Sequence, residues 1–102
     1  LACEAKPDLV IDFATLTGAA RVALGPDLPA FFTEDDTLAG ELAQHAAAQA
    51  DPLWRLPLWA PYNADLDSKI ADLNNVSTLS TAGAAIAALS LARFVAEGTR
   101  WA

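Results

Sequence analysis

The sequence predicts an α/β fold of three layers (αβα), in which helices cover both faces of a mixed, mostly parallel sheet. Two observations lead to this class. Residues 9–14 are apolar on both faces and partly β-branched, which is typical of an inner strand of a parallel sheet. Residues 35–50 and 82–97 have helical character and alternate with short strand-like runs. Both ends of the chain fall inside predicted elements, so we expect a part of a larger domain.

Four short elements are predicted before the first long helix. Residues 1–6 have the character of a last helical turn, which ends at a proline because proline cannot continue a helix. The strand at residues 9–14 follows. Residues 21–24 are predicted to form a short helix, since a Gly-Pro pair directly after them provides a stop signal. Residues 29–33 are predicted to be a second short strand, which leads into the long helix.

Residues 35–50 predict an amphipathic helix. Asp35 and Asp36 open it, where acidic side chains meet the positive end of the helix dipole. Its apolar positions recur three and four residues apart, at Leu38, Ala39, Leu42, Ala43, Ala46, Ala47 and Ala50. His45 lies on a partly polar face of this helix, and we interpret it as a solvated surface residue rather than a metal ligand or a base. Because the chain has one histidine, it has no histidine pair at helical spacing that would hold zinc.

The second half of the chain alternates irregular and helical segments. Residues 51–61 contain three prolines and two tryptophans and predict an ordered but irregular crossing segment. A short helix is predicted at residues 63–70, and a polar loop at residues 74–81. Residues 82–97 are apolar nearly all the way round, which predicts a helix that is buried on several sides and ends at a glycine. The last two residues, 101–102, are predicted to begin a strand.

Composition restricts the class of partner. The chain has 102 residues, of which 54% are hydrophobic, and this share is high for a small domain that stands alone. We therefore expect a partner surface, either another copy of the chain or neighbouring polypeptide. The net charge of −7 disfavours nucleic acid and anionic membrane surfaces as partners. Cys3 is the single cysteine, which excludes an intramolecular disulfide and fits a reducing, cytoplasmic compartment.

Acidic residues are the first candidates for catalysis, but none forms a convincing site. Asp12 lies in the first strand run, and we interpret it as a hydrogen-bonded structural aspartate rather than a catalytic carboxylate. Asp65 and Asp67 are too close in sequence to share one face of a helix. Asp35 and Asp36 are explained by helix capping. The pattern of residues alone therefore assigns no catalytic residue and no metal ligand in this chain.

The polar stretch that follows the first strand is a better candidate for ligand binding. Residues 15–18 leave the strand at its C-terminal end, which is the edge where open α/β sheets bind ligands. Gly18 permits either a close backbone approach or a positive φ, and the exposed amides of such a turn can hold a small polar ligand. A tight strand-to-helix turn without a ligand explains the same residues, and the pattern alone slightly favours that explanation.

Several separated stretches carry a more specific signal. They are, in chain order, D-F-A-T-L-T-G-A at 12–19 with A-L-G at 23–25, W-R-L-P-L at 54–58, S-K-I-A-D-L-N-N at 68–75, A-G-A at 82–84 with F-V at 94–95, and W-A at 101–102. Together they resemble motifs of the M17 family of leucyl (cytosol) aminopeptidases, in the same order and over nearly the whole chain. The resemblance places residues 1–102 in the C-terminal portion of that family's catalytic domain, incomplete at both ends.

The resemblance implies a dinuclear metallo-aminopeptidase that releases N-terminal residues, often leucine, from peptides. Two divalent ions (Mn, Zn or Mg) would polarise the scissile carbonyl and lower the pKa of a bridging water, and a bound bicarbonate would act as general base. The family's metal ligands correspond to positions upstream of Leu1, so the isolated chain is predicted to be inactive. The resemblance also implies a peptide substrate, a homo-oligomer (a hexamer in the family) and a cytoplasmic location.

Four residues correspond to substrate-binding positions of the family. Thr15, Leu16 and Gly18 correspond to residues that line the pocket for the N-terminal side chain. Val76 corresponds to an apolar residue at the pocket for the following side chain. The segment at residues 77–80 departs from the glycine- or lysine-containing versions of the family, which leaves the contacts at the pocket rim unassigned. The resemblance assigns no catalytic residue within the chain.

Two other classes of function are compatible with the same residues. The chain is then either a binding module that kept the peptide pocket and lost the metals, or a structural segment of a degenerate homologue that serves only assembly. Intact metal ligands upstream of the chain would exclude both alternatives. If those ligands are replaced, binding of peptides by the longer protein distinguishes the first alternative from the second.

Overall fold

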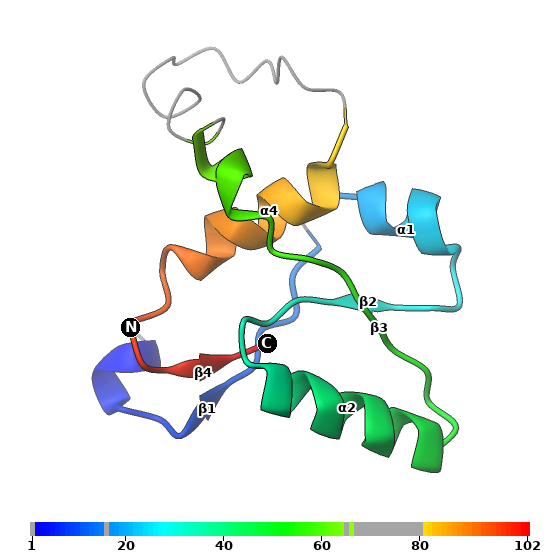
Figure 1. Cartoon of the computed structure of the whole chain (residues 1–102), viewed down its shortest axis with the longest axis horizontal. Helices are drawn as coiled ribbons and strands as arrows, with labels where there is room; N and C mark the ends of the chain where they lie inside the picture. Colours follow the sequence, from blue (N-terminus) through cyan, green and yellow to red (C-terminus); the bar gives the residue numbers. More distant parts are fainter. Residues whose placement is uncertain (1, 16, 65, 67–80) are drawn as a thin grey trace.

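The computed structural model describes residues 2–15, 17–64, 66 and 81–102. The elements are, in chain order, η1 (Ala2–Ala5), β1 (Leu9–Val10), α1 (Ala19–Leu24), β2 (Ala30–Phe31), α2 (Asp36–Ala48), β3 (Trp54–Arg55), η2 (Ala60–Tyr62), α4 (Gly83–Ala92) and β4 (Arg100–Trp101). The strands lie between α4 on one side and α2 on the other (Figure 1). The predicted αβα class of a partial domain is confirmed.

The four strands form two short parallel pairs. In the first pair, β1 runs beside β4, with Leu9 opposite Arg100 and Val10 opposite Trp101. In the second pair, β2 runs beside β3, with Ala30 opposite Trp54. The predicted strands at 9–14 and 29–33 are therefore correctly placed, although each regular pairing covers only two residues. The strand at residues 101–102 is also confirmed, and it begins one residue earlier than predicted.

Strand β3 was not predicted from the sequence. Its two residues lie between prolines, and prolines are not expected inside a strand. The backbone amides next to these prolines still pair with β2, because the Trp54 N–H donates to the Pro29 carbonyl at 2.9 Å and the Leu56 N–H donates to the Phe31 carbonyl at 3.0 Å. The crossing segment is thus partly regular, and its order comes from a strand more than twenty residues away.

Helix α2 follows its sequence signals closely. Asp35 is the N-cap, and its Oδ1 accepts a hydrogen bond from the backbone N–H of Leu38 at 2.9 Å. Leu38, Ala39 and Ala46 are buried. The helix ends two residues before the predicted boundary, and Ala50 lies beyond it with φ of +51°. Helix α1 also agrees with its stop signal, since Gly25 caps its C-terminal end with φ of +81°.

Helix α4 is shorter than predicted. Its burial on several sides agrees with the prediction, since Ile86, Ala88 and Leu89 are buried and the other residues of Gly83–Ala92 are half-buried. It ends at Ala92 instead of continuing to residue 97, because tight turns with bonds from Phe94 N to Leu91 O and from Thr99 N to Ala96 O lead into β4. Gly98, with φ of +83°, serves this last turn and does not cap the helix.

Three other predictions concern the chain ends and the middle of the sequence. The helical turn expected at residues 1–6 is the 3-10 turn η1. Of the helix predicted at residues 63–70, the described residues 63, 64 and 66 are helical. The loop predicted at residues 74–81 lies outside the described residues except for its last position. In the described part of the chain, no helix is long and apolar enough to cross a membrane.

The hydrophobic core lies where α4 packs on η2 and on the residues that flank η2. Leu66, Ile86 and Leu89 form its buried centre, and Leu58 and Tyr62 pack against them. This cluster ties α4 to η2 and holds the helix layer above the strands. Packing of this kind comes from the apolar residues of α4, which face several neighbours at once.

Candidate functional site

The candidate site is the segment that leaves β1 and enters α1. We define the site loop as residues 13–18, of which Leu16 lies outside the described residues. Its first side chain, Phe13, is 95% exposed, and Thr15 is also exposed. The structure thus places Thr15 and Gly18 at the C-terminal end of a parallel strand, the edge that binds ligands in open α/β sheets. Val76, the fourth predicted site residue, lies outside the described residues.

Gly18 lies in open space at the start of α1. It is the N-cap of the helix with φ of −88°, so of its two predicted roles the positive φ is wrong. A Cβ atom built on Gly18 has no described atom within 4 Å. The hydroxyl of Thr17, and not a side chain at the cap itself, accepts the N–H of Ala19 at 3.1 Å. Nothing in the described structure therefore requires glycine at position 18.

The start of α1 is held in place by α4. A Cβ atom on Gly83 would lie 3.2 Å from the Cβ of Ala19, so glycine allows the two helices to approach closely. Helices α1 and α4 meet near their N-terminal ends (Figure 1). Gly83 of the A-G-A motif thus packs against Ala19, the first residue after the site loop. The sequence pattern alone did not reveal this packing role.

The other end of the site loop is held by β4. The indole Nε1–H of Trp101 donates to the Asp12 carboxylate at 2.7 Å, and Trp101 is 8% exposed. The backbone N–H of Asp12 also donates to the carbonyl of Ala102 at 3.0 Å. Asp12 is therefore a hydrogen-bonded structural aspartate, as interpreted, but its partner is a tryptophan 89 residues away.

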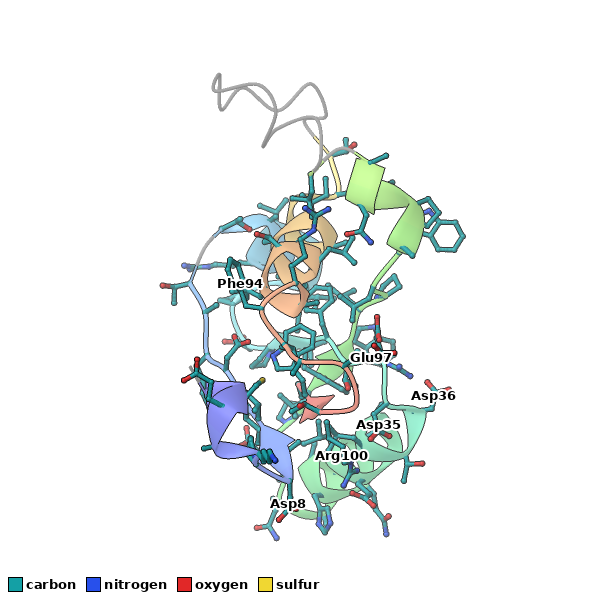
Figure 2. All side chains as sticks on the ribbon, turned by 90° about the vertical axis from the view of Figure 1, so that its left-hand side faces the viewer. Asp8, Asp35, Asp36, Phe94, Glu97 and Arg100 are labelled. Atoms are coloured by element: carbon teal, nitrogen blue, oxygen red, sulfur yellow. The ribbon has the colours of Figure 1, made fainter. Side chains whose placement is uncertain are left out.

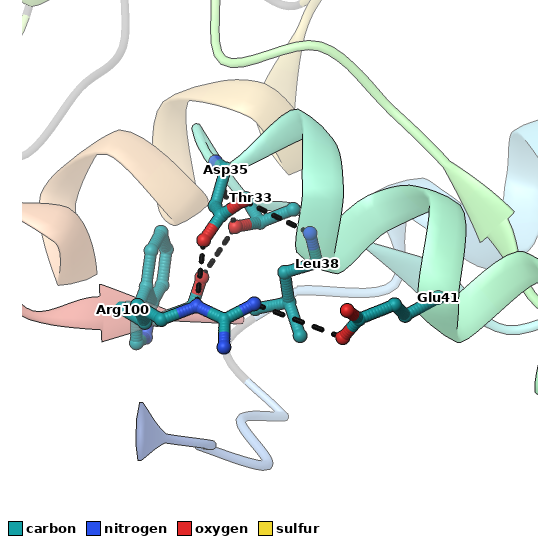
Figure 3. A network of polar contacts seen from close by, with 6 residues as sticks. Thr33, Asp35, Leu38, Glu41 and Arg100 are labelled. Atoms are coloured by element: carbon teal, nitrogen blue, oxygen red, sulfur yellow. Dashed lines mark hydrogen bonds and ion pairs between the residues drawn. The ribbon is translucent and has the colours of Figure 1, made fainter. Parts of the chain in front are cut away.

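A polar network surrounds the N-terminal end of α2. Arg100 donates from Nε to the Asp35 carboxylate at 2.7 Å and approaches Glu41 at 3.7 Å (Figure 3). Figure 2 shows Arg100 on the same side of the molecule as Asp35 and Asp36. The N–H of Leu38 and then the guanidinium of Arg100 hold the pKa of Asp35 below its ordinary value of 3.8. The sequence indicated only the capping role of these aspartates.

Two further contacts join this network to the sheets. The hydroxyl of Thr33, which is 2% exposed, donates to the Trp101 carbonyl at 2.5 Å and accepts the Asp35 N–H at 3.1 Å. Arg55 donates to the Thr33 carbonyl at 2.7 Å and pairs with Asp36 at 2.8 Å. Thr33 therefore connects the end of β2 to β4, which belong to different strand pairs.

A cavity of about 380 Å³ lies between the strands and the helices. Its walls are mainly apolar and come from both strand pairs, α2 and α4; they include Ile11, Phe31, Leu42, Ala88 and Trp101. Ala14 and Thr17 of the site loop also line it. The site loop thus lies over an incompletely filled interior, which fits the expectation that further polypeptide covers this chain.

The described residues do not fit a metal centre. Among them, no group of three or more His, Cys, Asp or Glu side chains comes close enough together to hold an ion. His45 is exposed on α2, as predicted for a solvated surface histidine. The carboxylates of Asp35 and Asp36 are each paired with an arginine instead. In the described part of the site loop, the polar groups are those of the backbone and the hydroxyls of Thr15 and Thr17.

A parallel α/β segment with a polar loop at the carboxyl edge of a strand is the arrangement of a ligand-binding part of an α/β enzyme. The sequence model described as "Cytosol aminopeptidase family, catalytic domain" (peptidase M17) matches residues 1–102. The chain therefore belongs to the M17 cytosol aminopeptidase family, a family of hydrolases, and the resemblance seen in its motifs is confirmed.

Individual relatives agree with this family. The probable cytosol aminopeptidase of Prochlorococcus marinus is 43% identical over 99% of this chain and 20% of its own length. Peptidase B of an Enterobacter species is 52% identical over 88% of this chain and 21% of its own length. The crystal structure of a cytosol aminopeptidase from Coxiella burnetii has a TM-score of 0.85 at 53% identity and covers 98% of this chain and 22% of that one. The chain thus spans about a fifth of the length of these relatives.

One structural neighbour has been described with a metal. The bottromycin maturation enzyme BotP in complex with Mn has a TM-score of 0.79 at 42% identity, and it covers 92% of this chain and 20% of its own chain. The part of BotP that superposes on this chain is therefore also a small part of a longer protein.

Proposed function

We propose that this chain is the substrate-binding segment of a metal-dependent aminopeptidase that releases N-terminal, leucine-type residues from peptides. The observation that carries the proposal is the site loop. In a chain of the M17 family, it places an exposed Thr15 and an unobstructed Gly18 at the C-terminal end of a parallel strand. Leu16 and Val76 complete the proposed substrate-binding set. The segment contributes walls of the pocket and no catalytic residue.

The metals of the proposed enzyme would be held outside the described residues. Manganese in the BotP neighbour supports the use of divalent ions, and two of them (Mn, Zn or Mg) are proposed here, with bicarbonate as a further bound group. Bound ions of this kind would polarise the peptide carbonyl. The residues of this chain would instead orient the peptide by binding its N-terminal side chain, which lowers the barrier by fixing the geometry of attack.

Location and assembly are also proposals. The names of the relatives support a cytoplasmic protein. Large apolar side chains at the surface, among them Val22, Trp54, Trp59 and Phe94, support burial against further polypeptide or other subunits of a homo-oligomer such as a hexamer. The net charge of −7 gives no support to nucleic acid or anionic membranes as partners.

Metal removal tests the proposed activity. The longer polypeptide that contains this segment is expected to hydrolyse leucine p-nitroanilide in the presence of Mn²⁺, and chelation by EDTA should abolish turnover until Mn²⁺ is restored. The 102-residue chain assayed alone should show no turnover. Chelator-sensitive turnover by the isolated chain would contradict the segment's proposed role. Peptide binding without turnover by the longer polypeptide would favour the binding-module alternative.

A substitution at Gly18 tests the role of the site loop in binding. Gly18→Val is expected to lower kcat/KM of the longer polypeptide by about 10-fold or more, because branched methyl groups would occupy space assigned to the substrate side chain. Its thermal stability should change little, since φ at Gly18 is negative and no described atom lies within 4 Å of a Cβ there.

Gly40→Val is the matched control for this experiment. Gly40 also has no described atom within 4 Å of a built Cβ, and it lies on α2, away from the site loop. We expect this variant to retain the kcat/KM of the parent protein. Equal kcat/KM for the two variants would show that Gly18 does not line the substrate pocket.

A further inference from the structure

We propose that Asp12 and Trp101 are positioning residues, whose hydrogen bond fixes the C-terminal end of β1 against β4 and so sets the position of the site loop. This inference rests on the proposed function of that loop. The carboxylate of Asp12 lies 2.7 Å from the indole nitrogen of Trp101. Neither residue belongs to the predicted substrate-binding set, and their sequence separation of 89 residues hides the pairing from any local pattern.

The indole of Trp101 is buried and needs an acceptor for its N–H. Trp101 is 8% exposed, and a buried indole N–H that lacks an acceptor is energetically costly. Asp12 supplies that acceptor with a charged oxygen, which makes the hydrogen bond stronger than one between neutral groups. This hydrogen bond therefore favours one position of the Asp12 carboxylate relative to the Trp101 indole.

Asp12 and Trp101 lie at the C-terminal end of β1. The Ala102 N–H donates to the Val10 carbonyl at 3.1 Å, and the Asp12 N–H donates to the Ala102 carbonyl at 3.0 Å. The side-chain bond between Asp12 and Trp101 adds a third attachment at the same place. Phe13, the next residue, is 95% exposed. The pair is thus attached directly before the chain leaves the sheet and enters the site loop.

Trp101 is itself held by contacts with the residues before α2. Its carbonyl accepts the hydroxyl of Thr33, and the preceding Arg100 is bound by Asp35 at the N-cap of α2. Trp101 is therefore fixed from the opposite side by the network of Figure 3. Through Trp101, Asp12 is thus connected to the N-terminal end of α2. A change at Asp12 should move the site loop while leaving that network in place.

The positioning role of the pair is separable from general stability. The core cluster of Leu66, Ile86 and Leu89 contains neither Asp12 nor Trp101, although Trp101 is itself buried. Asp12 is itself an exposed residue, so its truncation creates no buried cavity. Loss of the hydrogen bond should therefore displace the loop without unfolding the protein. A small displacement of a substrate-binding group is enough to reduce the rate strongly.

The test uses four single variants and one double variant of the longer polypeptide that contains this segment. Asp12→Ala removes the acceptor, whereas Asp12→Asn keeps an oxygen that can accept the indole N–H. Trp101→Phe removes the donor and keeps an aromatic ring. Asp8→Ala is the control, since Asp8 is an exposed aspartate that directly precedes β1, at the end of the strand away from the site loop. Steady-state kinetics with leucine p-nitroanilide and Mn²⁺ gives kcat and KM, and thermal unfolding gives the stability of each variant.

We expect Asp12→Ala and Trp101→Phe each to reduce kcat/KM by about 10-fold, mainly through KM, as for a displaced binding group. Asp12→Asn should stay within about threefold of the parent protein, and Asp8→Ala should match it. The double variant Asp12→Ala/Trp101→Phe should be no worse than either single variant, because both remove the same bond. Unchanged KM in Asp12→Ala with a lowered Tm would overturn the proposal in favour of a purely structural role. A loss in Asp12→Asn as large as in Asp12→Ala would overturn it as well.

Hydrogen exchange makes this test independent of the proposed activity. If the parent protein shows no peptidase activity at all, the proposed function fails, and exchange of the Asp12 and Ala102 amides, which are hydrogen-bonded between the ends of β1 and β4, decides the positioning role on its own. These amides should exchange faster in Asp12→Ala and Trp101→Phe, but not in Asp12→Asn or Asp8→Ala. Equal exchange of both amides in the parent protein and in all four single variants would overturn the positioning role, whatever the activity.

Discussion

Leu89→Ala is expected to lower the free energy of unfolding by about 2–5 kcal/mol, which is the usual cost of removing a buried leucine side chain. Leu89 is 4% exposed and belongs to the core cluster with Ile86 and Leu66. Helix α4 contacts both α1 and η2, so a cavity at Leu89 weakens the layer that also supports the start of α1. A loss of this size is comparable to a large part of the stability of a small domain.

Urea denaturation followed by tryptophan fluorescence measures this loss. Val22→Ala is the control, because Val22 is an aliphatic residue of α1 that is 89% exposed, and its truncation should change the free energy by less than about 0.5 kcal/mol. The two variants should therefore differ by more than about 1.5 kcal/mol. If Leu89→Ala costs no more than Val22→Ala, the cluster on α4 is not the core of this chain.

Those parts of the fold that depend on neighbouring residues were predictable. The acidic pair at the start of α2 predicted its N-cap, because capping uses a side chain three residues before the amide that it binds. The Gly-Pro pair after Leu24 predicted the end of α1 for a similar reason. The apolar run at residues 9–14 predicted a parallel strand in the right place.

The parts that depend on distant residues were not predictable from local patterns. Strand β3 exists because β2 offers it backbone partners, and its own prolines indicated an irregular segment. The pairings of Asp12 with Trp101 and of Arg100 with Asp35 span 89 and 65 residues. Helix α4 ends before its apolar run does, because the chain must turn to bring β4 beside β1. Periodicity and caps carry no information about such tertiary constraints.

The substrate-binding role of the site loop stays a prediction from the family motifs. The structure shows that Thr15 and Gly18 follow β1, which is where the strand pattern placed them. The reason for Gly83 in the A-G-A motif became clear only from its 3.2 Å approach to Ala19. Close packing between helices depends on the angle and distance of their axes, and a short sequence motif does not specify either.

Thr33→Val is expected to destabilise the protein by about 1–3 kcal/mol, because it leaves a buried carbonyl and a partly buried amide without their hydrogen-bond partner. The hydroxyl of Thr33 joins the carbonyl of Trp101 to the N–H of Asp35. Valine has nearly the same shape as threonine, so the packing around position 33 is kept. The bond from Arg55 also survives, since it goes to the backbone carbonyl of residue 33. The variant therefore isolates the contribution of a single hydroxyl group.

Thr37→Val is the matched control for this substitution. Thr37 is an exposed residue in the first turn of α2, and the same replacement there should cost less than about 0.5 kcal/mol. Thr33→Ser, which keeps the hydroxyl and loses a methyl group, should cost about 1 kcal/mol. Equal unfolding free energies for Thr33→Val and Thr37→Val would show that the two strand pairs hold together without the Thr33 hydroxyl. A selective loss at Thr33, accompanied by faster amide exchange at Ala102, would show that this hydroxyl holds β4 to the end of β2, and with it the strand that anchors the site loop.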